Sequence, residues 1–228
     1  MFRDTFAAII RLKPFAAVGE AAIVALLHGA REEKIAAGGA IMRRGEPADS
    51  LCVLLDGRLR VSVTSAEGRE HAFRLVEPPG IVGEVGVIDR GPRTADVVAA
   101  VPSRLVRISS RACLAAIRNH PDLAEAMMRL LCERIRDTSR GSESLATERL
   151  ESRLARFLLR LAHEYGRPHG TGLLLPMRLS QGDIGTMVAA TREAVNKQLR
   201  QWREAGIIGV DTGQIVLLAP ASLAALFD

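Results

Sequence analysis

The chain has 228 residues, of which 48% are hydrophobic and 25% charged. This balance argues against a disordered protein and allows one large or two modest globular domains. The net charge is +5, and ten Lys and Arg stand against seven Asp and Glu from Arg149 onward. A basic C-terminal third permits DNA binding but does not by itself indicate it, because many basic domains contact no nucleic acid.

The sequence shows no sign of a membrane segment or a metal site. Residues 1–15 have no long apolar core, and no stretch approaches the roughly 18 apolar residues that a membrane span needs. The three cysteines, Cys52, Cys113 and Cys132, are far apart and form no metal-type spacing. We therefore expect reduced thiols in a core or an interface, no bound metal, no membrane partner and a cytoplasmic location.

A hydrophobic period of two residues runs from 35 to 110. Apolar residues alternate with their neighbours in 51–55 and again in 59–63, and Asp56-Gly57 between them is the strongest hairpin signal of the chain. Glu67-Gly68 marks a second turn. Many short strands joined by Gly-rich turns, without helical crossovers, predict an antiparallel β-roll or barrel.

Helical spacing marks residues 1–30, as short helices, and then a long stretch from Pro121 past residue 160. One stripe of the long stretch steps alternately by three and four residues, through Met128, Leu131, Ile135, Thr138, Ser142 and Leu145. That spacing is typical of the seam of a two-stranded coiled coil, so we predict a homodimer. A lone amphipathic core helix is the alternative. Hydroxyls weaken an apolar seam, so those within it should have another use.

The C-terminal part is predicted as a winged helix-turn-helix. Two short helices, Ser180–Ala189 and Thr191–Glu204, have almost nothing between them; Ser180 with Asp183 forms a capping box, and Thr191 can cap the second helix. A loop is expected at Gly166–Gly172. Strands are expected at 173–175 and within 207–218, the latter turning at 211–213. The predicted fold class is α+β, with a β-roll domain at 1–118, a dimerisation helix at 119–147 and a DNA-binding domain at 148–228.

The richest local signal is the string IVGEVGVIDRGPRTADVV at 81–98. Gly83 and a second glycine flank Glu84 in a turn where backbone can approach a ligand closely. Arg93 and Thr94 follow nine residues later, and with nearby backbone N–H groups they make an anion site for one phosphate. The carboxylate can accept a hydrogen bond from a sugar hydroxyl. A sugar with one compact phosphate is what a cyclic nucleotide presents.

This string resembles the phosphate-binding cassette of cyclic-nucleotide-binding domains, whose pattern is GE-x-(A/G)-L followed by R-(S/T/A)-A. The resemblance implies that Glu84 binds the ribose 2′-hydroxyl and that Arg93 and Thr94 bind the cyclic phosphate. Gly83 and Val85 belong to the same expected site. Nearly the whole chain is similar to the cyclic-AMP receptor protein branch of the cyclic-AMP receptor protein / fumarate-nitrate regulator (CRP/FNR) family of bacterial transcription regulators.

The segment RIRDTS at 134–139 looks like the part of that branch's long helix where an Arg, a Thr and a Ser face the ligand. The resemblance implies that Arg134 lies in the site and that Thr138 and Ser139 reach the purine, one from each subunit. Such a role gives a use to hydroxyls at the seam. A plain polar pair on a helix is the alternative.

Two departures bear on the identity of the ligand. The link between Glu84 and Arg93 is one residue shorter than in the receptor protein and resembles the eukaryotic kinase regulatory domains. Thr94 replaces the more usual Ser or Ala, and in cyclic-GMP-binding domains a Thr here can bridge the phosphate and the guanine amino group. The predicted allosteric ligand is cyclic AMP, with cyclic GMP as the alternative.

The segment 179–199 matches the family's helix-turn-helix throughout. The resemblance implies that Arg192, Glu193 and Lys197 read base edges, as guanine acceptors suit Arg and Lys and the cytosine amino group suits Glu. Phosphate contacts are expected from Gln181, Thr191 and Arg200, and Asn196 lies on the same outward face. The expected inward face is Ile184, Val188, Val195, Leu199 and Trp202. A solvated charged helix face is the alternative.

One local feature departs from the usual helix-turn-helix. Ala189-Ala190 occupies the turn where Gly is frequent. One of these two alanines should therefore have a strained φ.

Other functions fit the sequence less well. A haem- or redox-sensing member of the family needs axial ligands or N-terminal cysteines, and His71, the only histidine of the roll, is expected to be an exposed imidazole. A cyclic-nucleotide module that regulates a protein without DNA needs no helix-turn-helix. An enzyme is unsupported, because no Walker loop, metal-ligand spacing or nucleophile–base motif is present. The expected partners are double-stranded DNA with a palindromic site, RNA polymerase and a second copy of the chain.

Overall fold

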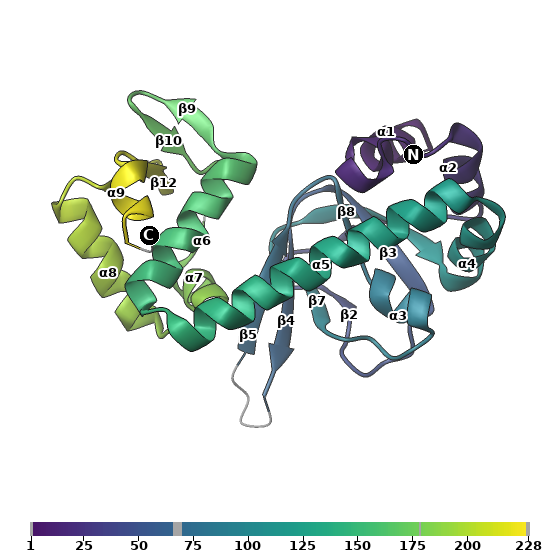
Figure 1. The fold of residues 1–228 in the computed structure, drawn as a ribbon, viewed down its shortest axis with the longest axis horizontal. Helices are drawn as coiled ribbons and strands as arrows, with labels where there is room; N and C mark the ends of the chain where they lie inside the picture. The colour runs from purple at the N-terminus through teal and green to yellow at the C-terminus, as the bar shows by residue number, and fades with distance from the viewer. Residues whose placement is uncertain (1, 66–69, 178, 227–228) are drawn as a thin grey trace. The chain divides into compact units, whose positions relative to one another are not determined.

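The computed structural model describes residues 2–65, 70–177 and 179–226. These residues form two compact units, Met1–Asp137 and Thr138–Asp228, which are described separately (Figure 1). The first unit begins with α1 (Phe2–Arg11), the 3-10 turn η1 (Lys13–Phe15) and α2 (Glu20–Leu26). The expected short helices at the N-terminus are thereby confirmed.

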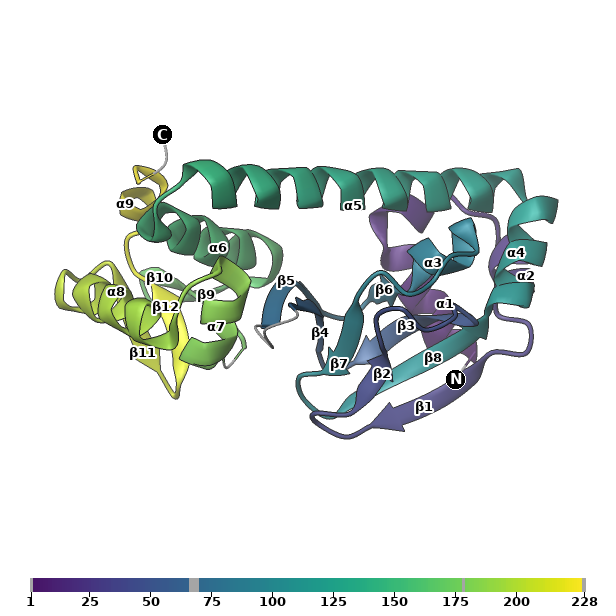
Figure 2. The same cartoon turned by 90° about the horizontal axis from the view of Figure 1, so that it is seen from below.

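The described strands of the first unit form two four-stranded antiparallel sheets, in the order β1-β8-β3-β6 and β2-β7-β4-β5 (Figure 2). This arrangement confirms the antiparallel roll. The strands are β1 (Arg31–Ile35), β2 (Ala40–Met42), β3 (Ser50–Asp56), β4 (Leu59–Thr64), β5 (Glu70–Val76), β6 (Gly80–Val82), β7 (Asp96–Ala99) and β8 (Ser103–Ser109). The second predicted turn, Glu67-Gly68, lies outside the described residues.

Strand β3 is buried on both faces. Cys52 and Leu54 join a core with side chains from both sheets, including Leu59 of β4. Leu51 and Val53 point the other way, into a core shared with α1, α2 and the helices that follow the roll. One sheet therefore has a roll interior on one side and a helical layer on the other, so the alternation read from the sequence marks two buried faces.

The prediction of a hairpin at Asp56-Gly57 is wrong. Within the described strands, β3 pairs with β6 and β8, whereas β4 pairs with β5 and β7. Gly57, at φ +91°, turns the chain from one sheet into the other, and a Cβ there would lie 2.3 Å from Ser103 Oγ. The turn therefore packs against the connection from β7 to β8, and its signal marks a tight turn without specifying which strands pair.

Three helices complete the first unit and lead out of it: α3 (Glu84–Asp89), α4 (Ser110–Asn119) and α5 (Pro121–Thr147). Glu84 was expected in a turn, and it is the first residue of α3 instead. Figure 1 shows α1, α2 and α4 around the beginning of α5, where Leu123, Met127 and Leu130 enter their common core.

The seam predicted on α5 lies apart from that core. Met128 is 59% exposed and Ile135 is 65% exposed, while Leu131 is partly buried. Thr138 and Ser142 are exposed as well. The side chain of Leu145 lies outside the described residues. The chain alone therefore leaves most of this stripe uncovered.

The second unit contains α6 (Leu150–Tyr165), β9 (Arg167–His169), β10 (Gly172–Leu174), α7 (Gln181–Val188), α8 (Arg192–Glu204), β11 (Ile208–Asp211), β12 (Gln214–Leu217) and α9 (Pro220–Ala224). Its described strands form one sheet in the order β11-β12-β10-β9. The prediction that Gly166–Gly172 is a loop is wrong, because this segment contains β9, which pairs with β10. The predicted hairpin turn is confirmed: Thr212 and Gly213 both have positive φ between Asp211 and Gln214.

The two helices of the helix-turn-helix begin and end as their caps predict. The capping box of Ser180 and Asp183 is formed, and Thr191 Oγ1 accepts from the amide of Ala194 at 3.2 Å. Ala189 has φ +50° and ψ +55°, which confirms the strained alanine. On the inward face, Ile184, Val188, Val195 and Trp202 are buried, and Leu199 is partly so.

None of the described helices is long and apolar enough to cross a membrane. Cys52 and Cys113 are buried and Cys132 is exposed, and all three are free thiols. Burial raises the pKa of the Cys52 and Cys113 thiols to about 12. Among the described residues, no group of three or more His, Cys, Asp and Glu could hold a metal ion.

Candidate functional site

Gly83 occupies a turn that other residues cannot adopt without strain. It has φ +82° and ψ +6°, directly before α3. A Cβ at this position would lie 2.5 Å from Met42 Cε and 2.8 Å from Arg93 Nη1. Its carbonyl oxygen accepts a hydrogen bond from Arg93 Nη1 at 3.3 Å. The conformation and the space around it both require glycine.

Glu84 is a buried carboxylate held by two arginines. Only 3% of the residue is exposed, and its Oε1 lies 3.2 Å from Arg134 Nε of α5 and 3.9 Å from Arg74 Nη1 of β5. A buried carboxylate needs such partners, because desolvation without compensation costs several kcal/mol. Arg134 was expected in this site. Arg74 was missed, because it lies on a strand far from the motif in the sequence and only the fold brings it to Glu84.

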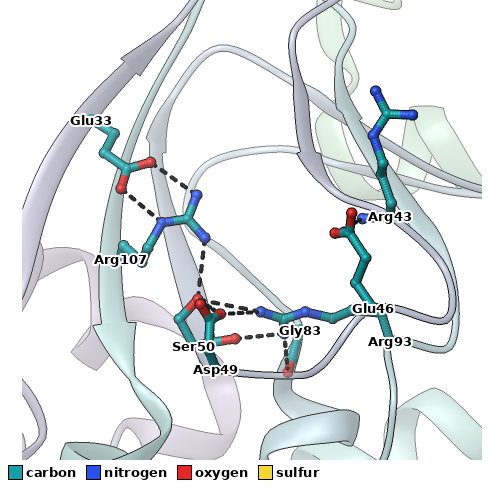
Figure 3. A network of polar contacts seen from close by, with 8 residues as sticks. All are labelled: Glu33, Arg43, Glu46, Asp49, Ser50, Gly83, Arg93 and Arg107. Carbon is teal, nitrogen blue, oxygen red and sulfur yellow. Dashed lines mark hydrogen bonds and ion pairs between the residues drawn. The ribbon is translucent and has the colours of Figure 1, made fainter.

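Arg93 is 5% exposed, and its guanidinium points into the first sheet (Figure 3). Nη1 donates to the carbonyl oxygens of Ser50, at 2.5 Å, and of Gly83. Nη2 donates to Ser50 Oγ at 3.2 Å and to Asp49 Oδ1 at 3.0 Å. The guanidinium is therefore held in one orientation by groups from the start of β3 and from the turn before α3.

The backbone around Arg93 is paired with the loop between β2 and β3. The amide of Gly45 donates to the carbonyl of Arg93 at 2.9 Å, and the amide of Arg93 donates to the carbonyl of Glu46 at 2.8 Å. Pro47 and Pro92 form an isolated bridge beside them. The two loops thus fix each other.

A second arginine reaches the same serine from the other side. Arg107 of β8 donates through Nη1 to Ser50 Oγ at 3.1 Å and binds Glu33 of β1 through Nε and Nη2, at 2.7 and 2.9 Å. The hydrogen bond to Glu33 raises the pKa of Arg107. The sequence did not predict the contacts among Glu33, Arg107 and Ser50, because these residues come from three strands that are distant in the chain.

Four other residues, Val85, Thr94, Thr138 and Ser139, were expected in the ligand site. Val85 is partly buried in α3, and Thr94 is exposed next to Arg93. Thr138 and Ser139 are exposed on α5, about one turn after Arg134. His71, expected to be exposed, is half-buried on β5.

The expected DNA-reading side chains lie on α8 and at its N-terminus. Thr191, Arg192, Glu193, Lys197 and Arg200 are exposed. Gln181 at the start of α7 and Asn196 are partly buried, and Gln181 Nε2 donates to Asn196 Oδ1 at 3.2 Å. This bond ties the two helices together, so these two amides also have a structural use.

Two further residues shape the turn between α7 and α8. A Cβ on Gly185 would lie 2.7 Å from the carbonyl oxygen of Ala190, so glycine permits the close approach. Arg153 of α6 donates through Nε to the carbonyl of Val188 at 3.0 Å, satisfying a carbonyl at the end of α7. Gly185 carries a sequence signal as a glycine inside a helix, whereas Arg153 carries none.

Two family models match the chain. The cyclic nucleotide-binding domain matches residues 32–120, and the Crp-like helix-turn-helix domain matches residues 152–226. The first covers the roll with Glu84 and Arg93, and the second covers α7 and α8.

Known proteins are similar over most of the chain. A CRP-like cAMP-activated global transcriptional regulator of Mycobacterium tuberculosis is 30% identical over 205 residues, 90% of this chain and 91% of the relative. A global nitrogen regulator of Synechococcus elongatus is 28% identical, over 86% of this chain and 89% of that protein. FixK2 of Bradyrhizobium japonicum shares the fold, with a TM-score of 0.77 at 23% identity over 86% of this chain and 96% of FixK2. The chain belongs to the CRP/FNR family of DNA-binding transcription regulators, which join a cyclic nucleotide-binding domain to a Crp-like helix-turn-helix.

Proposed function

We propose that this regulator binds cyclic AMP in the β-roll and responds by changing its affinity for DNA. The observation that carries the proposal is the buried Glu84, which lies beside Arg134 and directly after the positive-φ turn at Gly83. Glu84 accepts from the ribose 2′-hydroxyl, and Arg93 with Thr94 binds the phosphate. Gly83 and Val85 give backbone contact to the same ligand.

Comparison with known proteins supports the choice of cyclic AMP over cyclic GMP, and one feature of the sequence opposes it. The Mycobacterium tuberculosis relative, 30% identical, is described as cAMP-activated. Thr94 is exposed and therefore available to a ligand, and a threonine at this position also suits a guanine amino group. Cyclic GMP is the alternative ligand.

We propose a homodimer formed along α5. Met128 and Ile135 are large apolar side chains exposed on one stripe, and a second copy of the helix would bury them. Thr138 and Ser139 then reach the purine, one from each subunit. The nucleotide favours one arrangement of the two helices, because only a difference in affinity between arrangements shifts their populations.

The favoured arrangement places the two α8 helices on a palindromic DNA site, about one turn or roughly 34 Å apart. Arg192, Glu193 and Lys197 read base edges. Contacts to the DNA phosphate backbone fix the position of the protein on its site, and they come from Gln181, Thr191, Asn196 and Arg200. RNA polymerase is a further proposed partner. This function divides the chain into three parts: a β-roll domain at 1–118, a dimerisation helix at 119–147 and a DNA-binding domain at 148–228.

Calorimetric titration of the full chain with cyclic AMP and, separately, with cyclic GMP tests the ligand step. Wild type binds cyclic AMP more tightly, and Arg93→Ala loses most of that affinity. Arg90→Ala is the matched control, since Arg90 is an exposed arginine three residues away. Equal affinity of wild type and Arg93→Ala would refute the assignment of Arg93 to the phosphate, and no binding of either nucleotide would refute the function.

A further inference from the structure

A polar row crosses the first sheet at the end of the roll interior and leads to Arg93. The row consists of Glu33 of β1, Arg107 of β8 and Ser50 of β3, in that spatial order. Figure 3 shows that the side chain of Arg107 contacts the other two. The register explains the row: Arg107 lies opposite Cys52, and Ser50 is two residues before Cys52 on the same face. Because Cys52 and Leu54 point into the roll, Ser50 is the polar end of an inward-facing series.

The Ser50 hydroxyl uses its full hydrogen-bonding capacity. It accepts from Arg93 Nη2 at 3.2 Å and from Arg107 Nη1 at 3.1 Å, and it donates to Asp49 Oδ1 at 2.7 Å. A hydroxyl has one donor and two acceptor positions, so all of them are occupied. These three bonds fix the orientation of the Ser50 hydroxyl, and the fixed hydroxyl in turn restricts the positions of the Arg93 and Arg107 guanidinium groups.

Arg107 is itself fixed from the far side. Its two bonds to the two carboxylate oxygens of Glu33 form a bidentate pair, which sets the plane of the guanidinium as well as its position. With Nη1 directed at Ser50, Arg107 holds the hydroxyl without competing for Asp49. The row therefore runs from a clamped ion pair, through one serine, to the buried guanidinium of Arg93.

We propose that Ser50, supported by the Glu33–Arg107 pair, is a positioning residue for Arg93 and so sets the affinity and stereochemistry of phosphate binding. The inference rests on the proposed function of Arg93. Ser50 does not contact the ligand in this account. It limits the orientations of the guanidinium, so that the free energy of binding the phosphate is not spent on ordering an arginine side chain.

The test measures cyclic AMP binding by the full chain with Ser50→Ala. Losing a hydrogen bond to a charged group predicts an affinity about tenfold weaker. Ser103→Ala is the matched control: Ser103 is a buried serine of the same sheet, and its hydroxyl bonds the backbone of Arg58 and Val101 instead of Arg93. It is expected to bind cyclic AMP within about twofold of wild type.

The Glu33 end of the row has its own variant and control. Glu33→Gln keeps the shape of the side chain and removes its charge, and we expect a smaller loss of affinity, about threefold. Glu32→Gln alters the neighbouring residue of β1, which binds Arg104 instead. It should leave the affinity for cyclic AMP unchanged.

A second readout separates positioning from general damage. The two phosphorothioate diastereomers of cyclic AMP place sulfur on one or the other exocyclic position, so a fixed guanidinium distinguishes them and a loosely held one does so less. Ser50→Ala should reduce the ratio of their dissociation constants, whereas Ser103→Ala should keep it. A variant that only misfolds lowers the fraction of binding sites without changing this ratio.

The outcomes distinguish the two proposals. If wild type binds neither cyclic AMP nor cyclic GMP, the proposed function fails and the role of Ser50 fails with it. If wild type binds cyclic AMP and Ser50→Ala matches Ser103→Ala in both affinity and diastereomer ratio, the positioning role alone is overturned.

Discussion

Arg134 Nε lies 3.2 Å from Glu84 Oε1, so a residue of the long helix α5 compensates the buried carboxylate at the start of α3. The pair joins two segments that are fifty positions apart in the sequence. A ribose hydroxyl that binds Glu84 must share this carboxylate with Arg134. In the proposed function, ligand binding would therefore be coupled to the placement of α5 through the Glu84 side chain.

Arg134→Ala should destabilise the first unit by about 1–2 kcal/mol, less than the full cost of an unpaired buried charge, because Arg74 remains near Glu84 and Arg134 is partly exposed. Urea unfolding of Arg134→Ala, Glu84→Gln and the double variant measures this. The double-mutant cycle should give a coupling energy of about 1 kcal/mol. Additive effects of the two changes would show that the ion pair contributes nothing to stability.

Gly83→Ala should destabilise the fold and abolish cyclic nucleotide binding. The added Cβ would clash with Met42 and Arg93. The alanine would also have to adopt a left-handed backbone conformation, which costs about 1 kcal/mol on its own. Calorimetry and thermal unfolding of the variant measure the two effects.

Gly38→Ala is the matched control for that change. Gly38 has φ +79°, close to that of Gly83, but a Cβ there meets nothing within 4 Å. Gly38→Ala should lower the free energy of unfolding only by the cost of the left-handed backbone conformation, and it should bind the ligand as tightly as wild type. Equal losses in the two variants would contradict the tight packing at Gly83.

Ala189→Gly should stabilise the helix-turn-helix by about 0.5–1 kcal/mol, because glycine adopts the φ of +50° found at the end of α7 without strain. Ala205→Gly is the control, since Ala205 ends α8 at φ −80°. Glycine there should be neutral or destabilising. Urea unfolding followed through Trp202, which is buried in this unit, gives both values. Destabilisation by Ala189→Gly would exclude strain at this turn.

Asp122 should make stability depend on pH below about pH 4. Its Oδ2 accepts from the amide of Gly19 at 2.8 Å, and this bond holds the pKa of Asp122 below its ordinary value. A depressed pKa stabilises the folded state above the unfolded-state value, and the contribution is lost as the pH falls through the folded-state value. The difference in unfolding free energy between wild type and Asp122→Asn should therefore be largest near neutral pH and shrink in acid. A difference that is independent of pH would contradict this.

The sequence predicted the elements well because their signals are local. The caps at Ser180 and Thr191, the strained Ala189 and the turn at Thr212-Gly213 each depend on residues within a few positions. Hydrophobic periods likewise separated the roll from the helices that follow it. These features follow from backbone preferences that the neighbouring residues set.

Strand pairing was predicted less well. Asp56-Gly57 has the composition of a hairpin turn, yet the chain there passes from one sheet to the other, because β8 and β7 supply the partners of β3 and β4. The short β9–β10 hairpin was also missed, since Pro168 and its polar neighbours resemble a loop. Pairing depends on distant strands, which no local pattern specifies.

The sequence predicted that two residues of the candidate site lie together, but it did not predict the contacts around them. Glu84 and Arg134 do meet, and Gly83 does require glycine. Arg74 and Ser50 were not predicted, because the fold alone brings β5 close to Glu84 and β3 close to Arg93. A motif names the groups that face a ligand, whereas the groups that hold them come from the fold.

The most direct test of this account is the affinity for DNA measured with and without cyclic AMP. Fluorescence anisotropy on a palindromic operator selected from a random library should show binding at least about fivefold tighter when cyclic AMP is present, within the range of allosteric coupling. Arg93→Ala should keep the DNA affinity of the ligand-free wild type and lose the response. A wild-type protein that binds cyclic AMP but holds the operator with the same affinity in its presence and absence would contradict the central claim.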